Sequence, residues 1–555
     1  MKKFYFCFTI CIFLFSCSTL NKPHSYTDYS DRSSVLYQAE YAKRLLNEGK
    51  IPDALIRSYI LYLNTNDIPE VNGIKNESFK KAEDIFYKNI EEKNWDTALN
   101  YFRSLTALDG KPSGWTEERI LNERAAFWKT SGDIPLLNLT EKNTEKHTGT
   151  PRKIADMLKG TVTVWVDKGT RIEKGWGIAE AAIGSGFFVD KRGYFITNYH
   201  VIQSEVDPTY EGYSKLYIKS PDDPDIKISA KVIGWDPLFD LALVKTEFSP
   251  ETVFSLGSSK NLNVGSTIYA IGSPAGLDKT LTSGIVSAKY RRLFSMVDVM
   301  QIDAAINHGN SGGPIVNEDG HVQGVVFAGL ESNEGINFAI PVEFLKIILP
   351  DLYAGGEVKH SWLGGYGKIE KTESKTGGIK IEYILPGGPL SVSGIQEGAV
   401  ITEFNGMPVD SIEEMQAQLL SAAPDTIIKI KIKEKGADGL YAIKETPVLC
   451  KARPILPGKL IFKEDSDWRA MLPLLGFYLE SSGRRNSYRV SGVVPGSVAD
   501  KAGFTVNDYI ELNGKKWDED NEEIVHIRLY AKKIKAGYVD GFMMLTAYLD
   551  NPQLF

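Results

Sequence analysis

The residue best placed for covalent chemistry is a serine flanked by glycines. Ser311 lies in the stretch Gly309-Asn310-Ser311-Gly312-Gly313-Pro314, where the glycines permit a tight loop. Such a loop can present a hydroxyl and neighbouring backbone N–H groups to one substrate carbonyl. An ordinary turn is the alternative interpretation, because the same residue types also form loops without chemistry. A base and an acid elsewhere in the chain must decide between the two.

His200 is the candidate base. It follows a strand predicted over residues 193–198 and precedes Val201-Ile202, so it lies where a strand ends. The other histidines of the mature chain lie in tethers, in a hairpin turn, in downstream modules or on the serine's own loop: His24, His147, His321, His360, His526 and His308. His308 is too near to Ser311 in sequence to approach the hydroxyl from across a cleft.

Asp240 is the candidate acid that orients the imidazole. It precedes the apolar strand Leu241–Lys245, where a carboxylate is costly unless it is paired. Asp236 competes for this role, but the turn at Pro237 explains it adequately. The order His200, Asp240, Ser311 matches the chymotrypsin-like order, which predicts two β-barrels with the site in the cleft between them. Short strand signals support barrels, at residues 161–166, 186–189, 194–197, 215–218 and 226–233.

Five blocks around these residues resemble the HtrA (Deg) family of envelope proteases. They are residues 197–201, 240–243, 272–274, 282–287 and 303–314, and residues 335–341 continue the match. The resemblance implies a serine endopeptidase without a metal or other cofactor. Ser311 is then the nucleophile, His200 the base and Asp240 the orienting acid. The oxyanion hole is expected at Gly309, Asn310 and Ser311, with the N–H groups of Gly309 and Ser311 as donors.

Substrate preference and control follow from the same region. The specificity pocket is expected at Ala305, Ile306, Asn307, His308, Val325, Val326 and Phe327. No acidic residue lies there, so cleavage after Lys or Arg is not expected, and the resemblance implies small or aliphatic side chains. Digestive relatives carry an aspartate before the serine, which pairs with a newly cut N-terminus. Asn310 is uncharged, and this favours control through loop ordering instead.

Two similar stretches about 110 residues apart follow the protease region. Each resembles a PDZ domain. Their predicted carboxylate-binding loops are Leu363-Gly364-Gly365 and Leu475-Gly476-Phe477, and each ligand would add as a strand to a sheet edge. Packing modules are the alternative. The apolar ending Pro552–Phe555 could be a PDZ ligand in a neighbouring subunit, but we expect a frayed terminus.

The N-terminal part after the tether shows apolar residues at helical spacing, including Leu36 to Leu46 and Ala54 to Leu63. A second pair, Phe79–Ile90 and Trp95–Leu105, resembles the tetratricopeptide pattern. A docking surface for a partner and a helical spacer are equally compatible with this pattern.

The first residues read as a bacterial signal peptide. Lys2 and Lys3 precede an apolar run too short to span a bilayer, and Leu14-Phe15-Ser16-Cys17 resembles a lipobox with Cys17 as the lipidated residue. Ser18 is not the aspartate that retains lipoproteins at the inner membrane in some bacteria. The mature chain would keep Cys450 as its second cysteine, so no disulfide is expected within it.

The fold class expected is multidomain α+β. Its segments are a lipoprotein signal peptide (1–17), a tether (18–33), a helical tetratricopeptide-like region (34–130), a linker (131–150), a chymotrypsin-like protease domain (151–350) and two PDZ-like domains (356–455 and 468–550). With 43% apolar and 24% charged residues the chain is a folded globular protein, and its net charge of −7 gives no support for nucleic-acid binding.

The function predicted is a lipid-anchored, periplasm-facing endopeptidase that cleaves misfolded or selected envelope proteins and is regulated by peptide C-termini at its PDZ domains. A homo-oligomer, a trimer or a multiple of one, is expected from the resemblance. The alternative is a latent protease that serves as an adaptor or chaperone through its helical and PDZ modules.

Overall fold

The structure is a computed structural model of the 555-residue chain. It describes residues 28–131 and 157–555, apart from short segments at 174, 220–222, 224, 273–279, 293–297, 308, 330–334, 372–375, 421, 437–438, 519–520 and 534–537. The predicted signal peptide, Cys17, His308 and nearly all of the linker therefore lie outside the described residues. Within the described residues no helix is long and apolar enough to cross a membrane.

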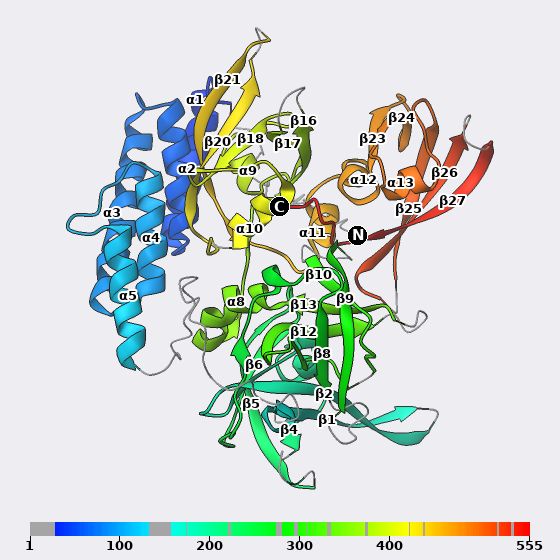
Figure 1. Ribbon diagram of the computed structural model, residues 1–555. Helices are drawn as coiled ribbons and strands as arrows, with labels where there is room; N and C mark the ends of the chain where they lie inside the picture. Colours follow the sequence, from blue (N-terminus) through cyan, green and yellow to red (C-terminus); the bar gives the residue numbers. More distant parts are fainter. Residues whose placement is uncertain are drawn as a thin grey trace, which may run out of the picture.

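Five helices form the N-terminal unit, which is blue to cyan in Figure 1. They are α1 (Arg32–Asn47), α2 (Ile51–Asn64), α3 (Pro69–Glu91), α4 (Trp95–Ala107) and α5 (Glu117–Ser131). Asp31 caps α1 by accepting the N–H groups of Ser33 and Ser34, and a proline lies in the first turn of α2 and of α3. The predicted helical region is confirmed, although Leu63 of its second apolar stripe is 53% exposed.

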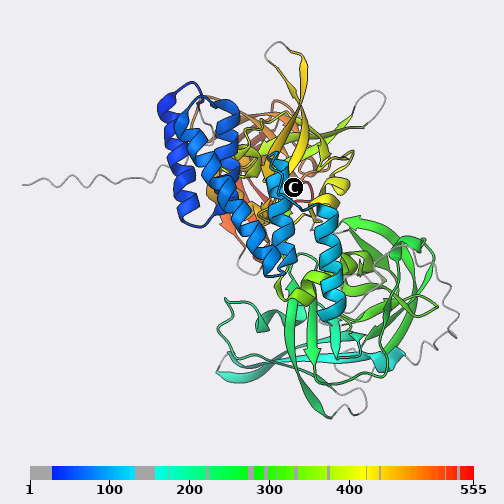
Figure 2. The same ribbon diagram turned by 90° about the vertical axis from the view of Figure 1, so that its left-hand side faces the viewer.

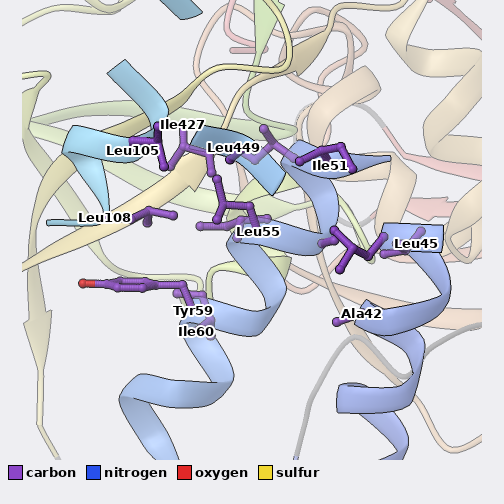
Figure 3. Packing of buried hydrophobic residues seen from close by; sticks show 14 of the residues in the cluster. Ala42, Leu45, Ile51, Leu55, Tyr59, Ile60, Leu105, Leu108, Ile427 and Leu449 are labelled. Atoms are coloured by element: carbon purple, nitrogen blue, oxygen red, sulfur yellow. The ribbon is translucent and has the colours of Figure 1, made fainter. Parts of the chain in front are cut away.

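The helical unit packs on the first PDZ-like domain. Figure 3 shows Ile427 and Leu449 of that domain among the side chains of the helical core, beside Leu55 and Leu105. The Ile427 N–H donates to the Ser104 hydroxyl at 2.9 Å. The helices and the PDZ-like sheet therefore share one apolar core, which side chains far apart in sequence create.

The protease region forms two closed six-stranded barrels, so the predicted double barrel is confirmed. The first contains β1 (Thr161–Glu173), β2 (Trp176–Asp190), β3 (Tyr194–Thr197), β4 (Lys215–Lys219), β5 (Lys227–Asp236) and β6 (Leu241–Thr246), and β5–β6 pairing closes it. The second contains β8 (Thr267–Gly272), β9 (Thr280–Arg292), β10 (Asp298–Ile302), β11 (Pro314–Val316), β12 (His321–Gly329) and β13 (Asn337–Pro341), and β11–β12 pairing closes it. Strand β7 (Ser255–Leu256) pairs with β12.

Helix α8 (Val342–Ala354) and strand β14 (Gly356–Glu357) lead out of the protease region. Strand β14 pairs in parallel with β5, and the Val358 N–H donates to the Trp235 carbonyl at 2.8 Å. The first residues of the segment predicted as the first PDZ-like domain thus extend the sheet of the first barrel.

Two PDZ-like sheets follow, the first olive-green to yellow and the second orange to red in Figure 1. The first has the strand order β16 (Gly365–Lys371), β17 (Thr376–Ile384), β18 (Val400–Phe404), β20 (Ile427–Lys435), β21 (Tyr441–Leu449), with helix α10 (Ile412–Leu420). Its shorter elements are β15 (Ser361–Trp362), α9 (Pro389–Val392), β19 (Met407–Pro408) and β22 (Lys451–Ala452).

The second sheet has the order β23 (Phe477–Ser481), β24 (Ser487–Val493), β25 (Tyr509–Trp517), β26 (Ile524–Lys533), β27 (Val539–Tyr548). Helices α11 (Pro457–Glu464) and α12 (Asp467–Leu475) precede it, and α13 (Val498–Lys501) lies between β24 and β25. Seen from the side in Figure 2, the protease barrels lie below the PDZ-like sheets and the helical unit.

The last residues of the chain are not frayed. Leu554 is 1% exposed and Phe555 is fully buried, so the expectation of a loose terminus is wrong. Figure 1 places this end between the two PDZ-like domains. The terminus is ordered because both of its last side chains are apolar and each is buried in a hydrophobic cluster.

Candidate active site

His200 lies directly after β3, on the short helix α7 (Tyr199–Ile202). Two hydrogen bonds join this segment to the turn at Asp240. The Asp240 carbonyl accepts the Asn198 side-chain amide at 2.8 Å and the Tyr199 N–H at 3.2 Å. Val201 and Ile202 are buried in the first barrel, so the histidine ring is held at its rim with its side chain 47% exposed.

Asp240 holds His200 through both carboxylate oxygens. Oδ2 lies 2.7 Å from the imidazole Nδ1, and Oδ1 accepts the His200 backbone N–H at 2.8 Å. A carboxylate only accepts, so Nδ1 carries the proton and Nε2 is left as the basic nitrogen. Asp240 has a φ of +51°, a conformation that costs energy in a residue with a side chain and often marks a functional site.

Opposing effects determine the pKa of His200. Partial burial lowers it, while the charge of Asp240 and the hydrogen bond from Nδ1 raise it, and together they outweigh the burial. The net result is a pKa above the ordinary value of 6.5, as expected for an imidazole whose charged form has a carboxylate beside it.

Ser311 lies on the loop between β10 and β11 of the second barrel. Three N–H groups of this loop are engaged: Asn310 donates to Asn307 O at 3.0 Å, Gly312 to Val326 O at 3.0 Å and Gly313 to Asn310 O at 2.9 Å. In the described part of the chain, the N–H groups of Gly309 and Ser311 donate to no backbone carbonyl. The N–H groups of Gly309 and Ser311 therefore stay available as donors, whereas the N–H of Asn310 between them is engaged within the loop.

The hydroxyl of Ser311 makes no hydrogen bond to the described residues. In ligand-free enzymes the bond between nucleophile and base is often long and tightens only when substrate binds. Gly309 has a φ of +97° and Gly312 a φ of +85°, which a side chain would oppose. A Cβ at Gly312 would lie 2.3 Å from the Ser185 carbonyl oxygen, so the loop also needs glycine for close packing.

Ser185 is a residue that the sequence reasoning missed. It is fully buried in β2, its N–H donates to the Ser311 carbonyl at 2.8 Å, and its hydroxyl donates to the Gly309 carbonyl at 2.6 Å. The serine of one barrel thereby fixes the nucleophile loop of the other. The pattern Gly184-Ser185-Gly186 in an otherwise apolar strand was the available signal, since strand glycines often mark a close approach of backbones.

The residues of the predicted specificity pocket lie on two segments of the second barrel. Ala305 and Asn307 are exposed and Ile306 is half-buried, on the loop after β10, while Val325, Val326 and Phe327 belong to β12. The Ala305 carbonyl accepts the Thr282 hydroxyl at 3.0 Å. Asn310 points inward: its side chain is 4% exposed and packs against Gly272. The pocket assignment stays a prediction.

Asp236 takes a structural part. Its Oδ1 accepts the N–H groups of Leu238 and Phe239 at 2.9 and 3.1 Å, and its Oδ2 lies 2.7 Å from Nε2 of His360. Asp236 is fully buried and the His360 side chain is 6% exposed. This contact therefore links the turn before Asp240 to His360, which lies at the start of the first PDZ-like domain. Neither residue's sequence neighbours indicate this pair.

The two predicted carboxylate loops differ in the structure. The Gly365 N–H lies at a sheet edge and binds an oxygen of Phe555 at 3.0 Å. By contrast, Leu475 ends helix α12, and the Gly476 N–H is engaged as its cap, donating to Met471 O and Leu472 O at 3.0 Å each. The second loop therefore offers no free Gly476 donor to a carboxylate.

These features define a class of protein. Two closed barrels, with a paired histidine and aspartate on one and a glycine-flanked serine on the other, are the architecture of a trypsin-like serine peptidase. Family comparison agrees: residues 184–325 match the trypsin-like peptidase domain, 356–433 the PDZ domain, 458–549 the TP0546 family PDZ domain and 33–127 a domain of unknown function, DUF8517.

Curated relatives make the assignment narrower. A probable periplasmic serine endoprotease of DegP-like type from Chlamydia pneumoniae is 32% identical over 376 residues, 62% of this chain and 73% of the relative. The corresponding protein of Marinomonas sp. is 31% identical over 353 residues, 60% of this chain and 72% of the relative. The chain belongs to this DegP-like (HtrA/Deg) family of serine endoproteases, as the sequence resemblance predicted.

Coverage is not complete for all relatives. The match to the Pseudomonas fulva protein, at 35% identity, spans 46% of this chain and 54%, about half, of that relative's length. Among solved structures, the HtrA-type protease AlgW with tripeptide aligns at 26% identity and a TM-score of 0.46, covering 54% of this chain and 96% of that chain. A serine endoprotease from Yersinia pestis aligns at 27% identity and a TM-score of 0.42, covering 55% and 100%.

Proposed function

We propose that the chain is an envelope serine endopeptidase that cleaves misfolded or selected proteins, with His200, Asp240 and Ser311 as its catalytic residues. The observation that carries the proposal is the 2.7 Å contact between Nδ1 of His200 and Asp240, on the barrel that faces the Ser311 loop. One carboxylate binds both the ring and the backbone N–H of this histidine, which fixes the orientation of the imidazole as a catalytic base requires.

The reaction follows from the groups present. Ser311 Oγ attacks the peptide carbonyl while Nε2 of His200 takes its proton, and Asp240 stabilises the imidazolium that forms. The oxyanion is bound by the N–H groups of Gly309 and Ser311. His200 then gives its proton to the leaving amine, and water repeats the sequence to release the acyl group.

Hydrolysis of an unfolded protein tests the proposal. The wild-type chain should cleave a reduced, alkylated protein substrate, and Ser311→Ala should lower kcat by a factor on the order of 10⁶ if the three residues act as a unit. Ser204→Ala is the matched control, because this serine lies just after α7, near His200 in the chain, and its hydroxyl forms a hydrogen bond with that of Ser214 at 3.0 Å. Substrate binding without cleavage by the wild-type chain would favour the adaptor or chaperone alternative.

We propose that peptide capture belongs to the first PDZ-like domain. Its edge strand β16 has donors and acceptors at a sheet edge, and helix α10 lies beside it. In the second domain no helix lies between β25 and β26 within the described residues, and its Gly476 N–H is engaged. Strand addition to β16 with a side-chain pocket below is the recognition mode that fits.

We further propose that the chain self-associates. The β1–β2 hairpin extends beyond the first barrel, and its tip exposes Ile172 and Trp176 at 78% and 77%. Exposed apolar side chains of this size favour a contact between copies. Light scattering should give a mass above that of one chain for the wild type and a lower mass for Trp176→Glu; identical masses would contradict this role of the hairpin.

Membrane attachment rests on the sequence alone. We propose that Cys17 becomes the lipidated N-terminus after cleavage of the signal peptide, because Leu14-Phe15-Ser16-Cys17 follows a charged and an apolar segment. Metabolic labelling with a fatty-acid analogue should label the wild type and not Cys17→Ser. Equal labelling of both would contradict the proposed anchor.

A further inference from the structure

The chain's last four residues lie along the edge strand of the first PDZ-like domain. The Phe555 N–H donates to the Gly365 carbonyl at 2.9 Å, and the Gly365 N–H donates back to a Phe555 oxygen at 3.0 Å. Two residues further along, the Gly367 N–H donates to the Gln553 carbonyl at 3.4 Å. Leu554 and Tyr366 form an antiparallel bridge. The tail is therefore an added strand on β16.

The Phe555 side chain fills the pocket below this strand. It is fully buried in the apolar core of the domain, together with Leu363, Leu390 and Leu419. The glycines of β16 make room for the ring: a Cβ at Gly365 would lie 2.8 Å from its Cε2, and one at Gly367 would lie 3.1 Å from its Cε1. An aromatic last residue thus matches a space that only glycine on the strand leaves open.

Helix α10 holds the tail from the other side. The Gln416 amide, 2% exposed, donates to the Pro552 carbonyl at 2.7 Å and to the Leu554 carbonyl at 3.3 Å. Both contacts are to the main chain, so they do not depend on the tail's side chains. An external peptide with an apolar last residue can make the same contacts.

The segment before the tail directs it into this groove. Strand β27 ends at Tyr548, and Asn551 then accepts the Gln553 N–H at 2.9 Å while its amide donates to the Pro473 carbonyl at 2.6 Å. Leu554 points away from Phe555, into an apolar cluster that the two PDZ-like domains share, with Trp362 of the first and Leu475 of the second. The tail therefore contacts both domains of its own chain.

We infer that Pro552–Phe555 is an intramolecular ligand of the first PDZ-like domain, and that a peptide with an apolar or aromatic last residue binds this groove only by displacing it. The inference rests on the proposed peptide capture by this domain. Its consequence is quantitative. If the groove is open for only a fraction of the time, the apparent dissociation constant of a peptide rises by the reciprocal of that fraction.

Fluorescence anisotropy with a labelled peptide tests the inference. The probe is the decapeptide of residues 546–555, and the protein is the full chain carrying Ser311→Ala, so that the probe is not cleaved. Phe555→Ala in the protein should tighten probe binding by about tenfold or more, because it removes the group that fills the pocket. Gln553→Ala is the matched control, since this side chain is half-exposed on the same tail and its main-chain bonds remain.

A pocket variant locates the binding. Gly365→Val combined with Phe555→Ala should abolish probe binding, because the side chain introduced at position 365 fills the space that the probe's terminal phenylalanine ring needs. Thermal unfolding of each variant verifies that it is folded, and deletion of residues 552–555 serves as a second opening variant. A tail held in the same chain also predicts that the effect persists over about a hundredfold dilution of the protein, whereas a tail supplied by a second copy would dissociate.

Three outcomes would overturn the inference. Equal probe affinity of the intact and tail-altered proteins, in a Gly365-dependent site, would mean that the tail does not occupy the groove, while peptide capture itself would stand. Loss of the effect on dilution would assign the tail to a neighbouring copy. Absence of probe binding to every form would exclude peptide capture by this domain as well, and proteolysis by the unaltered Ser311 protein would then show that only that part of the proposed function had failed.

Discussion

Replacing Ser185 by alanine tests whether the contact between the two barrels contributes to catalysis, without altering His200, Asp240 or Ser311. The substitution removes the 2.6 Å hydrogen bond from the Ser185 hydroxyl to the Gly309 carbonyl, while the backbone bond from Ser185 to the Ser311 carbonyl remains. The Gly309 carbonyl, which belongs to the Gly309–Asn310 peptide, then loses a buried partner, and the preceding peptide carries the Gly309 N–H that is the proposed oxyanion donor. Ser185 is fully buried, so substrate does not reach it and its role is that of a positioning residue.

The expected magnitude follows from burial. Leaving a buried acceptor without its donor costs about 1–3 kcal/mol. If the same cost appears in catalysis because Gly309 rotates and its N–H leaves the oxyanion position, kcat falls by about 5- to 150-fold, since each 1.36 kcal/mol is a factor of ten. The KM should change little, since substrate contacts outside the loop are unaltered.

Steady-state kinetics with a peptide substrate and thermal unfolding measure the two possible effects separately. Ser185→Cys is the conservative companion, because a thiol retains a weak donor, and it should recover part of kcat. A lower unfolding temperature with an unchanged kcat would refute the reasoning, since Ser185 would then stabilise the barrels without positioning the loop.

Three further predictions concern the acid, the base and the link to the first PDZ-like domain. Asp240→Asn should lower kcat by a factor on the order of 10³–10⁴, because the amide no longer favours the Nδ1–H tautomer; a change below tenfold would contradict its role. Activity requires neutral His200, whose pKa is raised above 6.5, so kcat/KM should fall as pH drops through that raised pKa. In Asp240→Asn the residual activity should extend to lower pH, because the charge that raises the pKa of His200 is gone. If activity fell at the same acidic pH in both proteins, a group other than His200 would control that fall. His360→Ala should lower the free energy of unfolding by about 3–5 kcal/mol, because Oδ2 of the buried Asp236 loses its partner while Oδ1 keeps its two backbone donors. An unchanged denaturation midpoint would mean that this pair does not stabilise the link between the two domains.

Much of the protease architecture was predictable because its signals are local. Each catalytic candidate lies beside a strand end or a glycine loop, and the chain order of His200, Asp240 and Ser311 restricts the fold to double barrels. Apolar runs broken by glycine predicted the strands. The helical spacing of the N-terminal region predicted hairpins, although the tetratricopeptide resemblance stays a prediction.

The contacts that were not predictable join residues distant in sequence. Ser185 and Gly309 are 124 positions apart, as are Asp236 and His360, and neither pair has a periodic or motif signal. The apolar tail is visible in the sequence, but its burial depends on two domains that come together only in the fold. The same holds for Ile427, whose N–H meets Ser104 across 323 positions.

The measurement that tests the central claim most directly is the identification of the nucleophile. The folded chain is treated with a fluorophosphonate, which reacts with an activated serine, and the adduct is located by mass spectrometry. We predict one adduct, on Ser311, that is lost in His200→Ala as well as in Ser311→Ala. An adduct on another serine, or labelling of Ser311 that persists without His200, would contradict the account.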